Sequence, residues 1–268
     1  MHVRREYKYL VPRERLSEFR SVLLPFVEMD RYAQMGNGID YKVRSIYFDT
    51  GHLSFYLEKL AGVKIRKKFR VRAYDNQSRD SVVFLEIKQK DEDVISKNRA
   101  PVYYRDLKSF LLWGNIDSYI LNGGKHPKAC DDARKFLYYY YKKNLVPNVL
   151  VVYDREAYYS KFNPDLRITF DKNICSKVVT TTDELYSRYK TGFIMRDYFV
   201  LEVKFYSGYP LWLRGIIREF SLQQRSVSKY SFCIDIHKNE LDITFKRSLH
   251  EWAQEFYAMK NNIKGVRK

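Results

Sequence analysis

Six segments of the chain alternate charged and apolar residues with a period of two, which is the pattern of a β-strand with one polar face. In the segment 67–74, for example, Lys68, Arg70 and Arg72 share one face and apolar residues occupy the other. The pattern therefore predicts six amphipathic strands. They lie at 4–11, 67–74, 82–90, 149–159, 166–172 and 199–206.

Helical spacing appears between these strands. Pro12 suits a first helical turn, and Leu16, Phe19, Leu23 and Phe26 follow it at helical intervals. Strands outnumber helices and do not alternate with them regularly, which favours an α+β fold with a mainly antiparallel sheet over a doubly wound parallel sheet. Further helices are predicted at 105–121, 131–144, 211–220 and 248–262.

The charged strand faces have two interpretations. A solvent-facing polar side is the default for an antiparallel sheet. A shared interior is favoured by the six cations within residues 64–72, by apolar helix stripes that could cover the other strand faces, and by a Glu-x-Lys pattern on three strands. We therefore predict a closed antiparallel β-barrel tunnel with a charged lumen and helices packed outside. The three pairs are Glu6/Lys8, Glu86/Lys88 and Glu202/Lys204.

A lumen lined by many lysines and arginines would have to hold water and a polyanion, because unpaired buried charge is costly. Arginine presents a bidentate fork to phosphate, and lysine presents a point charge. The remaining glutamates could orient the cations or bind a divalent metal through hard oxygen atoms. The pattern thus points to a phosphate-rich ligand.

The overall charge is compatible with a second class of partner. Among 268 residues, 49 Lys and Arg against 32 Asp and Glu give a net charge of +17, and 24 Tyr and 17 Phe are present. Such a composition also suits nucleic-acid binding. Nucleic acid is nevertheless disfavoured, because the sequence carries no helix-turn-helix, zinc-finger or RNA-recognition signature and its aromatic residues fall mostly on apolar faces.

Common enzyme motifs are missing. The chain has neither GxxxxGK[ST] nor GxGxxG, so a P-loop and a Rossmann pyrophosphate site are unsupported. The histidines show no zinc-binding spacing, and no nucleophile is evident. Any chemistry is therefore expected to be electrostatic and metal-assisted rather than covalent.

Cellular location follows from three observations. No stretch of about 18 apolar residues could form a membrane span, and the N-terminal decapeptide lacks an apolar signal core. Cys130, Cys175 and Cys233 lie far apart and form no CxxC pair. A cytoplasmic location is expected, although a membrane-bound partner stays possible.

At this point nine segments resemble the VTC domain, the polyphosphate polymerase domain of the triphosphate tunnel metalloenzyme superfamily, in its stand-alone bacterial type. The similarity spans about residues 1–235. It implies a closed β-tunnel with helices around it. We therefore expect a single domain over 1–268, in which residues 236–268, with the predicted helix at 248–262, form a C-terminal helical extension. The segments are REYKYLV, SIYFDT, KIRKKFRVRAY, FLEIKQK, SKNRAPV, VVYDREAYY, LRITFDK, FVLEVKFY and SVSKYSF.

The resemblance also implies roles for eleven residues. One departure is Lys59, which stands where an arginine is often expected and keeps the charge without the bidentate fork. Glu202 matches the metal-binding glutamate. Substrate binding is implied for Lys8, Lys59 and Lys97, and catalysis for Arg70, Arg72, Lys88, Arg155, Arg167, Lys204 and Lys229.

The function implied is that of a metal-dependent phosphotransferase that passes the γ-phosphoryl group of ATP to a growing polyphosphate chain. The expected ligands are ATP, triphosphate and polyphosphate, and the expected cofactor is Mn²⁺ or Mg²⁺. Two alternatives stay open: a metal-dependent inorganic triphosphatase, and a polyphosphate-binding module without activity.

Overall fold

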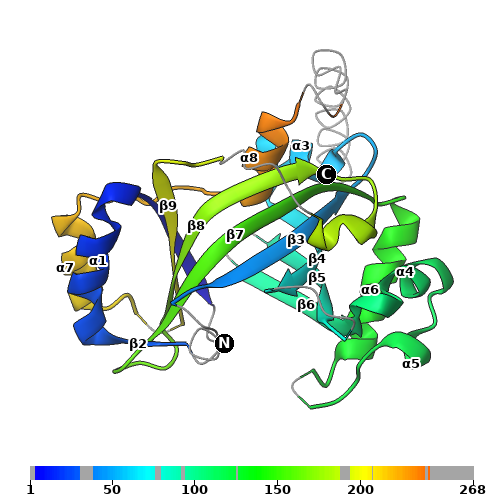
Figure 1. Ribbon diagram of the computed structural model, residues 1–268, viewed down its shortest axis with the longest axis horizontal. Helices are drawn as coiled ribbons and strands as arrows, with labels where there is room; N and C mark the ends of the chain where they lie inside the picture. Colours follow the sequence, from blue (N-terminus) through cyan, green and yellow to red (C-terminus); the bar gives the residue numbers. More distant parts are fainter. Residues whose placement is uncertain are drawn as a thin grey trace, which may run out of the picture.

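The computed structural model describes residues 4–30, 39–75, 80–91, 94–124, 126–187, 194–206, 208–238 and 241. Within these residues, a single curved sheet of nine strands forms the centre of the molecule (Figure 1). All its strand pairs are antiparallel, as the α+β prediction requires. The strands are β1 (Arg5–Pro12), β2 (Val27–Met29), β3 (Tyr41–Asp49), β4 (Ile65–Tyr74), β5 (Val82–Asp91), β6 (Val94–Tyr103), β7 (Val146–Ser160), β8 (Arg167–Val178) and β9 (Tyr198–Phe205).

Helices flank the sheet on several sides. In Figure 1, α1 and α7 flank one end of the sheet, α4, α5 and α6 flank the other, and α3 and α8 lie over its upper rim. The helices are α1 (Leu16–Leu23), α3 (Ser54–Leu60), α4 (Tyr104–Trp113), α5 (Ile116–Tyr119), α6 (Ala129–Lys142), α7 (Leu211–Glu219) and α8 (Lys229–Ile236), with short 3-10 turns at Arg13–Arg15, Leu24–Phe26 and Thr182–Tyr186.

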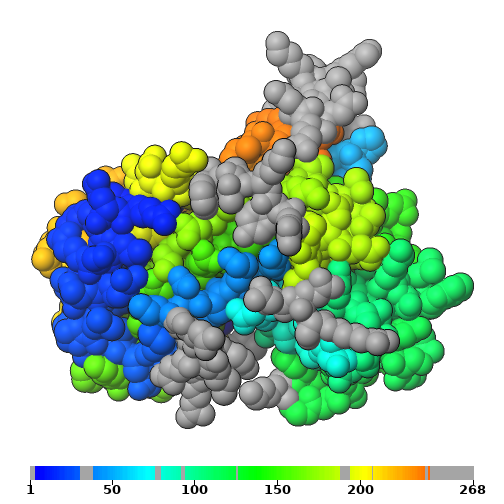
Figure 2. Space-filling model, viewed as in Figure 1, coloured from blue at the N-terminus to red at the C-terminus, as the bar shows by residue number. Residues whose placement is uncertain are grey.

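The apolar strand faces pack against these helices and form three buried clusters. Phe69 and Val71 of β4 belong to the cluster under α4 and α6, whereas Phe170 of β8 belongs to the cluster under α1 and α7. A third cluster joins β3 and β7 to α3 and α8. The space-filling view shows the N-terminal elements and the α4–α6 group at opposite ends of one face (Figure 2). In the first two clusters the apolar strand residues face outward to the helices, so the charged residues between them face inward. The third cluster lies on the concave side, where its Tyr47 and Tyr153 line the inner cavity.

The predicted closed barrel is wrong, because the sheet is an open half-barrel. Its strand order is β1-β9-β8-β7-β3-β4-β5-β6, and the described residues show no pairing between the edge strands β1 and β6. Each edge is instead capped by another segment. The amide of Arg225 donates to the carbonyl of Lys8 at 2.9 Å, and the amide of Leu121 donates to the carbonyl of Pro101 at 3.0 Å. These segments satisfy part of the backbone hydrogen-bonding capacity of the two edge strands. Closing the barrel by pairing β1 with β6 would have to displace them.

Side chains cross the gap that the backbone leaves open. The ammonium group of Lys88 on β5 lies 2.9 Å from the Glu6 carboxylate on β1. A salt bridge therefore spans the two sides of the lumen where a closed barrel would have a strand ladder.

The helix predictions fared unevenly. The predicted helices at 131–144 and 211–220 match α6 and α7 within a few residues. The single helix predicted at 105–121 is two helices, because Gly114 adopts a positive φ of 68° and ends α4. The helix predicted at 248–262 lies outside the described residues, as does most of the extension at 236–268.

Three strands, β2, β3 and β6, escaped the alternation criterion, and β2 has only three residues. β3 is buried on both faces over Ser45–Asp49, so its sequence shows no regular alternation there. β6 carries Pro101 and is an edge strand, where proline is tolerated. In the described part of the chain, no helix has the length and apolar character needed to cross a bilayer.

Candidate functional site

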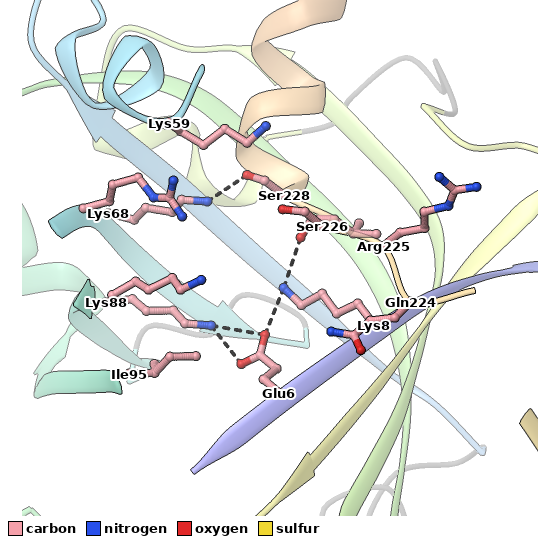
Figure 3. A pocket seen from close by; sticks show the side chains of 13 residues that line it. Glu6, Lys8, Lys59, Lys68, Lys88, Ile95, Gln224, Arg225, Ser226 and Ser228 are labelled. Atoms are coloured by element: carbon pink, nitrogen blue, oxygen red, sulfur yellow. Dashed lines mark hydrogen bonds and ion pairs between the residues drawn. The ribbon is translucent and has the colours of Figure 1, made fainter. Parts of the chain in front are cut away.

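Two connected cavities occupy the concave side of the half-barrel. The inner cavity measures about 250 Å³ and is lined by the inward faces of the strands together with the start of α8. The outer cavity measures about 650 Å³ and opens toward Lys59, Arg66 and Lys90. Figure 3 shows the outer cavity, with the side chains of Lys8 and Glu6 on one side and Lys68 and Lys88 on the other (Figure 3). Seven residues line both cavities: Glu6, Lys8, Lys68, Lys88, Ile95, Val227 and Ser228.

The inner cavity is strongly cationic. Among the described residues that line it are twelve lysines and arginines but only two carboxylates, Glu6 and Glu202. Three further carboxylates, Glu86, Asp171 and Asp30, lie buried against these cations. Five carboxylates thus face twelve cations, an imbalance that favours an anionic ligand. The cations are Arg4, Lys8, Lys68, Arg70, Arg72, Lys88, Lys97, Arg99, Arg155, Arg167, Lys204 and Lys229.

Glu86 is the buried centre of one group of cations. Its side chain is 0% exposed, and its carboxylate lies 2.6 Å from Arg70, 3.9 Å from Arg72, 2.6 Å from Lys97 and 3.2 Å from Arg99. Burial alone would raise the pKa of this carboxyl, but the surrounding charges hold it well below its usual value. Glu86 therefore stays ionised and holds four cations on one wall of the cavity.

Asp171 organises the opposite wall. Arg155 donates both of its fork nitrogens to Asp171, at 2.6 and 2.8 Å, and the ammonium of Lys229 approaches the same carboxylate to 2.5 Å. The bidentate contact fixes the plane of the Arg155 guanidinium. Arg167, on the same strand as Asp171, is held instead by Asp30 at 2.7 Å.

The two lumenal glutamates lie together. Glu202 is within hydrogen-bonding reach of Glu6, and its carboxylate lies 3.1 Å from Lys204 and 3.9 Å from Lys8. Burial would raise the pKa of Glu202, but Lys204 and Lys8 hold it well below its usual value. Two carboxyl groups side by side amid lysines form the one concentration of hard oxygen ligands among the described residues that line the cavity.

The lysines show how poorly the cavity charge is balanced. Burial lowers the pKa of Lys204 to about 7, although Glu202 and Glu6 act in the opposite direction. Burial likewise lowers the pKa of Lys97 to about 7. The pKa of Lys68 is also well below its usual value, first through burial and then through repulsion by Lys8 and Lys88. A bound polyanion would favour the charged form of these three lysines, whereas the pKa values of Lys8 and Lys229 are already raised by neighbouring carboxylates.

The structure brings ten of the eleven sequence-predicted site residues to the inner cavity. Lys59 is the exception, because α3 places it at the outer cavity. The residues at the inner cavity are Lys8, Arg70, Arg72, Lys88, Lys97, Arg155, Arg167, Glu202, Lys204 and Lys229.

Several lumenal residues have no role predicted from the sequence. Arg99 lines the cavity and stacks on Phe84, with its guanidinium carbon 3.6 Å from the ring centroid. Arg99 lies two residues after Lys97 on β6, so both side chains point to the same face of the strand, and this spacing could have identified Arg99 as lumenal. Arg4 and Lys68 share the same strand faces as Lys8 and Arg70, and the alternation identified their orientation without giving them a function.

A divalent metal can be tested against this donor set. Among the described residues, no group of three or more His, Cys, Asp or Glu side chains could hold a metal alone. Glu6 and Glu202 provide two carboxylates, and Mg²⁺-type ions commonly bind one or two carboxylates together with substrate phosphates. The residues therefore fit a metal that enters with a phosphate ligand.

Two solved structures align with the chain, each at a TM-score of 0.46: a candidate adenylate cyclase from Bacillus halodurans (15% identity, 85% of this chain and 94% of that one) and a candidate adenylyl cyclase from Hippeastrum, reported with dominant triphosphatase activity (13%, 87% and 95%). No curated protein sequence matches significantly. The model of the VTC domain, however, matches residues 3–237. The chain belongs to the VTC domain family.

Proposed function

We propose that the protein is a polyphosphate polymerase, which transfers the γ-phosphoryl group of ATP to the end of a polyphosphate chain held in the half-barrel. The observation that carries the proposal is the convergence of twelve described cations on one cavity with five carboxylates. Membership of the VTC domain family supports it. Because the lumen has charge for several phosphates, chain length rather than a nucleotide base would dominate recognition.

Phosphoryl transfer needs alignment and charge stabilisation more than covalent help. Arg70 and Arg72, backed by Glu86, would hold phosphate oxygens on one wall, and Arg155, backed by Asp171, would hold them on the other. Lys88 and Lys204 lie between these walls near the glutamates. Fixed cations on two sides would lower the repulsion between donor and acceptor phosphates and keep them in line.

The metal belongs to the same proposal. Glu202 and Glu6 would hold Mn²⁺ or Mg²⁺, which would neutralise charge developing on the phosphate oxygens. Lys8 and Lys204 beside these carboxylates would keep them ionised and therefore competent as ligands. The proposal also places the protein in the cytoplasm. Its three cysteines are free thiols, which suits a reducing compartment.

Inorganic triphosphatase is the second candidate, and the open sheet favours it. No strand ladder joins β1 to β6, and the outer cavity shares lining residues with the lumen, so we infer that water can reach the bound phosphates. The same cations would then orient triphosphate while water replaced the polyphosphate acceptor. Product identity separates the two activities.

Affinity is expected to follow the number of phosphates. Tripolyphosphate and ATP should bind at least about a hundredfold more tightly than AMP, because each charged hydrogen bond contributes roughly 1.5–3 kcal/mol. Binding should weaken as salt is raised, since exposed parts of the field are screened over about 8 Å at physiological ionic strength. Calorimetric titration with AMP, ATP and tripolyphosphate at two salt concentrations checks this. Equal affinity for AMP and ATP would contradict the proposal.

Polyphosphate binding is expected to take up protons near neutral pH. The pKa of Lys204 is about 7 in the free protein, and a bound polyanion would raise it. Affinity should therefore be greatest below pH 7 and fall by up to about tenfold per pH unit above it. The Lys97 side chain is 42% exposed and better hydrated, so the expectation rests on Lys204.

Titration of long-chain polyphosphate in two buffers with different heats of protonation measures the proton uptake. The matched variant is Lys204→Arg, because arginine stays protonated over this range. It should take up fewer protons than the wild type and lose most of the pH dependence. Identical proton uptake in the two proteins would show that Lys204 is already charged in the free protein.

A further inference from the structure

Two cations of the site lie on helices rather than on the sheet. Lys229 is the first residue of α8 and lines the inner cavity, whereas Lys59 lies in α3 and lines the outer one. The N-cap of α8, Ser228, also accepts a 2.7 Å hydrogen bond from the ammonium of Lys68. Figure 3 shows Lys59, Lys68 and Ser228 on the same side of the outer cavity (Figure 3). Because no strand ladder fixes these helices, their placement depends on side-chain contacts.

Buried Asp49 supplies the first of these contacts. It ends β3, and its carboxylate accepts the backbone amides of Phe55 and Tyr56 at 3.0 Å each, which satisfies the amino end of α3. The same carboxylate accepts the hydroxyl of Tyr230, the second residue of α8, at 2.6 Å. One side chain therefore ties α3, α8 and the sheet together next to Lys229.

A second hydrogen bond between a tyrosine and an aspartate joins α3 and α8, and here the tyrosine belongs to α3 and the aspartate to α8. Tyr56 of α3 donates its hydroxyl to Asp235 of α8 at 2.5 Å. The two bonds lie near opposite ends of α8, one at its second residue and the other at its seventh. Together they fix both the position and the direction of the helix. We call Asp49, Tyr56, Tyr230 and Asp235 the α3–α8 clamp.

The clamp also reaches the arginine wall. The ring of Tyr230 stacks on that of Tyr47, with centroids 5.0 Å apart and planes at 24°. The hydroxyl of Tyr47 accepts a 3.0 Å hydrogen bond from Arg70. Asp49 therefore acts on two cations through Tyr230. Lys229 is the residue next to Tyr230 in the chain, and Arg70 is reached through the stacked ring of Tyr47.

We propose that Asp49 and Tyr230 are positioning residues, which set Lys229 of α8 against the sheet-borne cations so that both contact the same phosphate chain. The ligand in this statement rests on the proposed function. Apolar packing alone would hold α8 without a buried carboxylate, and burial of a carboxylate is costly unless its hydrogen bonds are made. The clamp meets that condition with three backbone or side-chain donors from two helices.

The test is a double-mutant cycle of Tyr230→Phe and Lys229→Met, with tripolyphosphate affinity measured by calorimetry and unfolding temperature measured in parallel. Tyr230→Phe should weaken binding roughly tenfold in the wild-type background. It should have little further effect once Lys229 is already methionine, because coupled residues are not additive. The matched control is Tyr158→Phe.

Tyr158 is buried and donates its hydroxyl to a buried carboxylate, Glu156, at 3.0 Å, but it packs under α1 and α7 away from the cavities. Its replacement should lower the unfolding temperature and leave affinity unchanged. Unchanged affinity in Tyr230→Phe, or an equal loss in both Lys229 backgrounds, would overturn the positioning role. Failure of the wild type to bind tripolyphosphate would instead overturn the proposed function.

Discussion

Replacement of Glu86 by glutamine is expected to lower the free energy of unfolding by about 3–5 kcal/mol, the usual cost of leaving buried charge without its partner. Glu86 is fully buried and holds Arg70, Arg72, Lys97 and Arg99 on one wall of the cavity. Glutamine keeps the shape but removes the charge that compensates these cations. Tripolyphosphate should restore part of the loss, because it brings negative charge to the same wall.

The matched control is Glu156→Gln. Glu156 is equally buried and pairs with Arg20 and Lys172, but it lies under α1 on the outer side of the sheet. Thermal unfolding should show both variants destabilised. Tripolyphosphate should raise the unfolding temperature of Glu86→Gln more than that of the wild type or of Glu156→Gln. An equal rise in all three proteins would mean that the Glu86 cations do not meet the ligand.

Replacement of Glu202 by glutamine is expected to reduce metal-dependent turnover by about a hundredfold while polyphosphate binding is retained or strengthened. Glutamine is a much poorer metal ligand than a carboxylate. The change also removes one negative charge from a cavity in which Lys204 and Lys8 surround Glu202. Metal use and polyanion affinity should therefore move in opposite directions.

The competing explanation is that Glu202 only pairs with Lys204 for stability. In that case Glu202→Gln would lower the unfolding temperature, as Glu156→Gln does, without altering the dependence of turnover on Mn²⁺. Turnover against Mn²⁺ concentration, polyphosphate affinity and thermal stability should be measured on the same preparations. Unchanged turnover in Glu202→Gln would remove this residue from the metal site.

The inward faces of the strands were predictable from the sequence, because a strand has a period of two and its apolar face must be covered. Lys68, Arg70 and Arg72 accordingly face the lumen while Phe69 packs against α6. The alternation therefore located most of the cations without any knowledge of strand order. It could not specify which cations share a carboxylate. The four partners of Glu86 lie on β4 and β6, the two strands that flank β5, and the alternation of one strand does not identify its neighbours.

The period-two alternation could not predict how the two edge strands are paired. Nothing in the alternation of β1 and β6 indicates that Arg225 and Leu121 would cap their free edges and leave the barrel open. The α3–α8 clamp was equally hidden, because Asp49 and Tyr230 lie far apart in the chain and meet only after the sheet and both helices are assembled. Long-range hydrogen bonds between single side chains leave no periodic signal.

The central claim is that the cationic half-barrel builds polyphosphate. The most direct measurement incubates the purified protein with ATP and Mn²⁺, sizes the product on a gel and determines orthophosphate in parallel. The account predicts long phosphate chains whose yield falls in Arg70→Ala and Glu202→Gln. Orthophosphate released from triphosphate without chain growth would contradict polymerase activity and identify a hydrolase, and tight binding without any turnover would contradict both enzymatic functions.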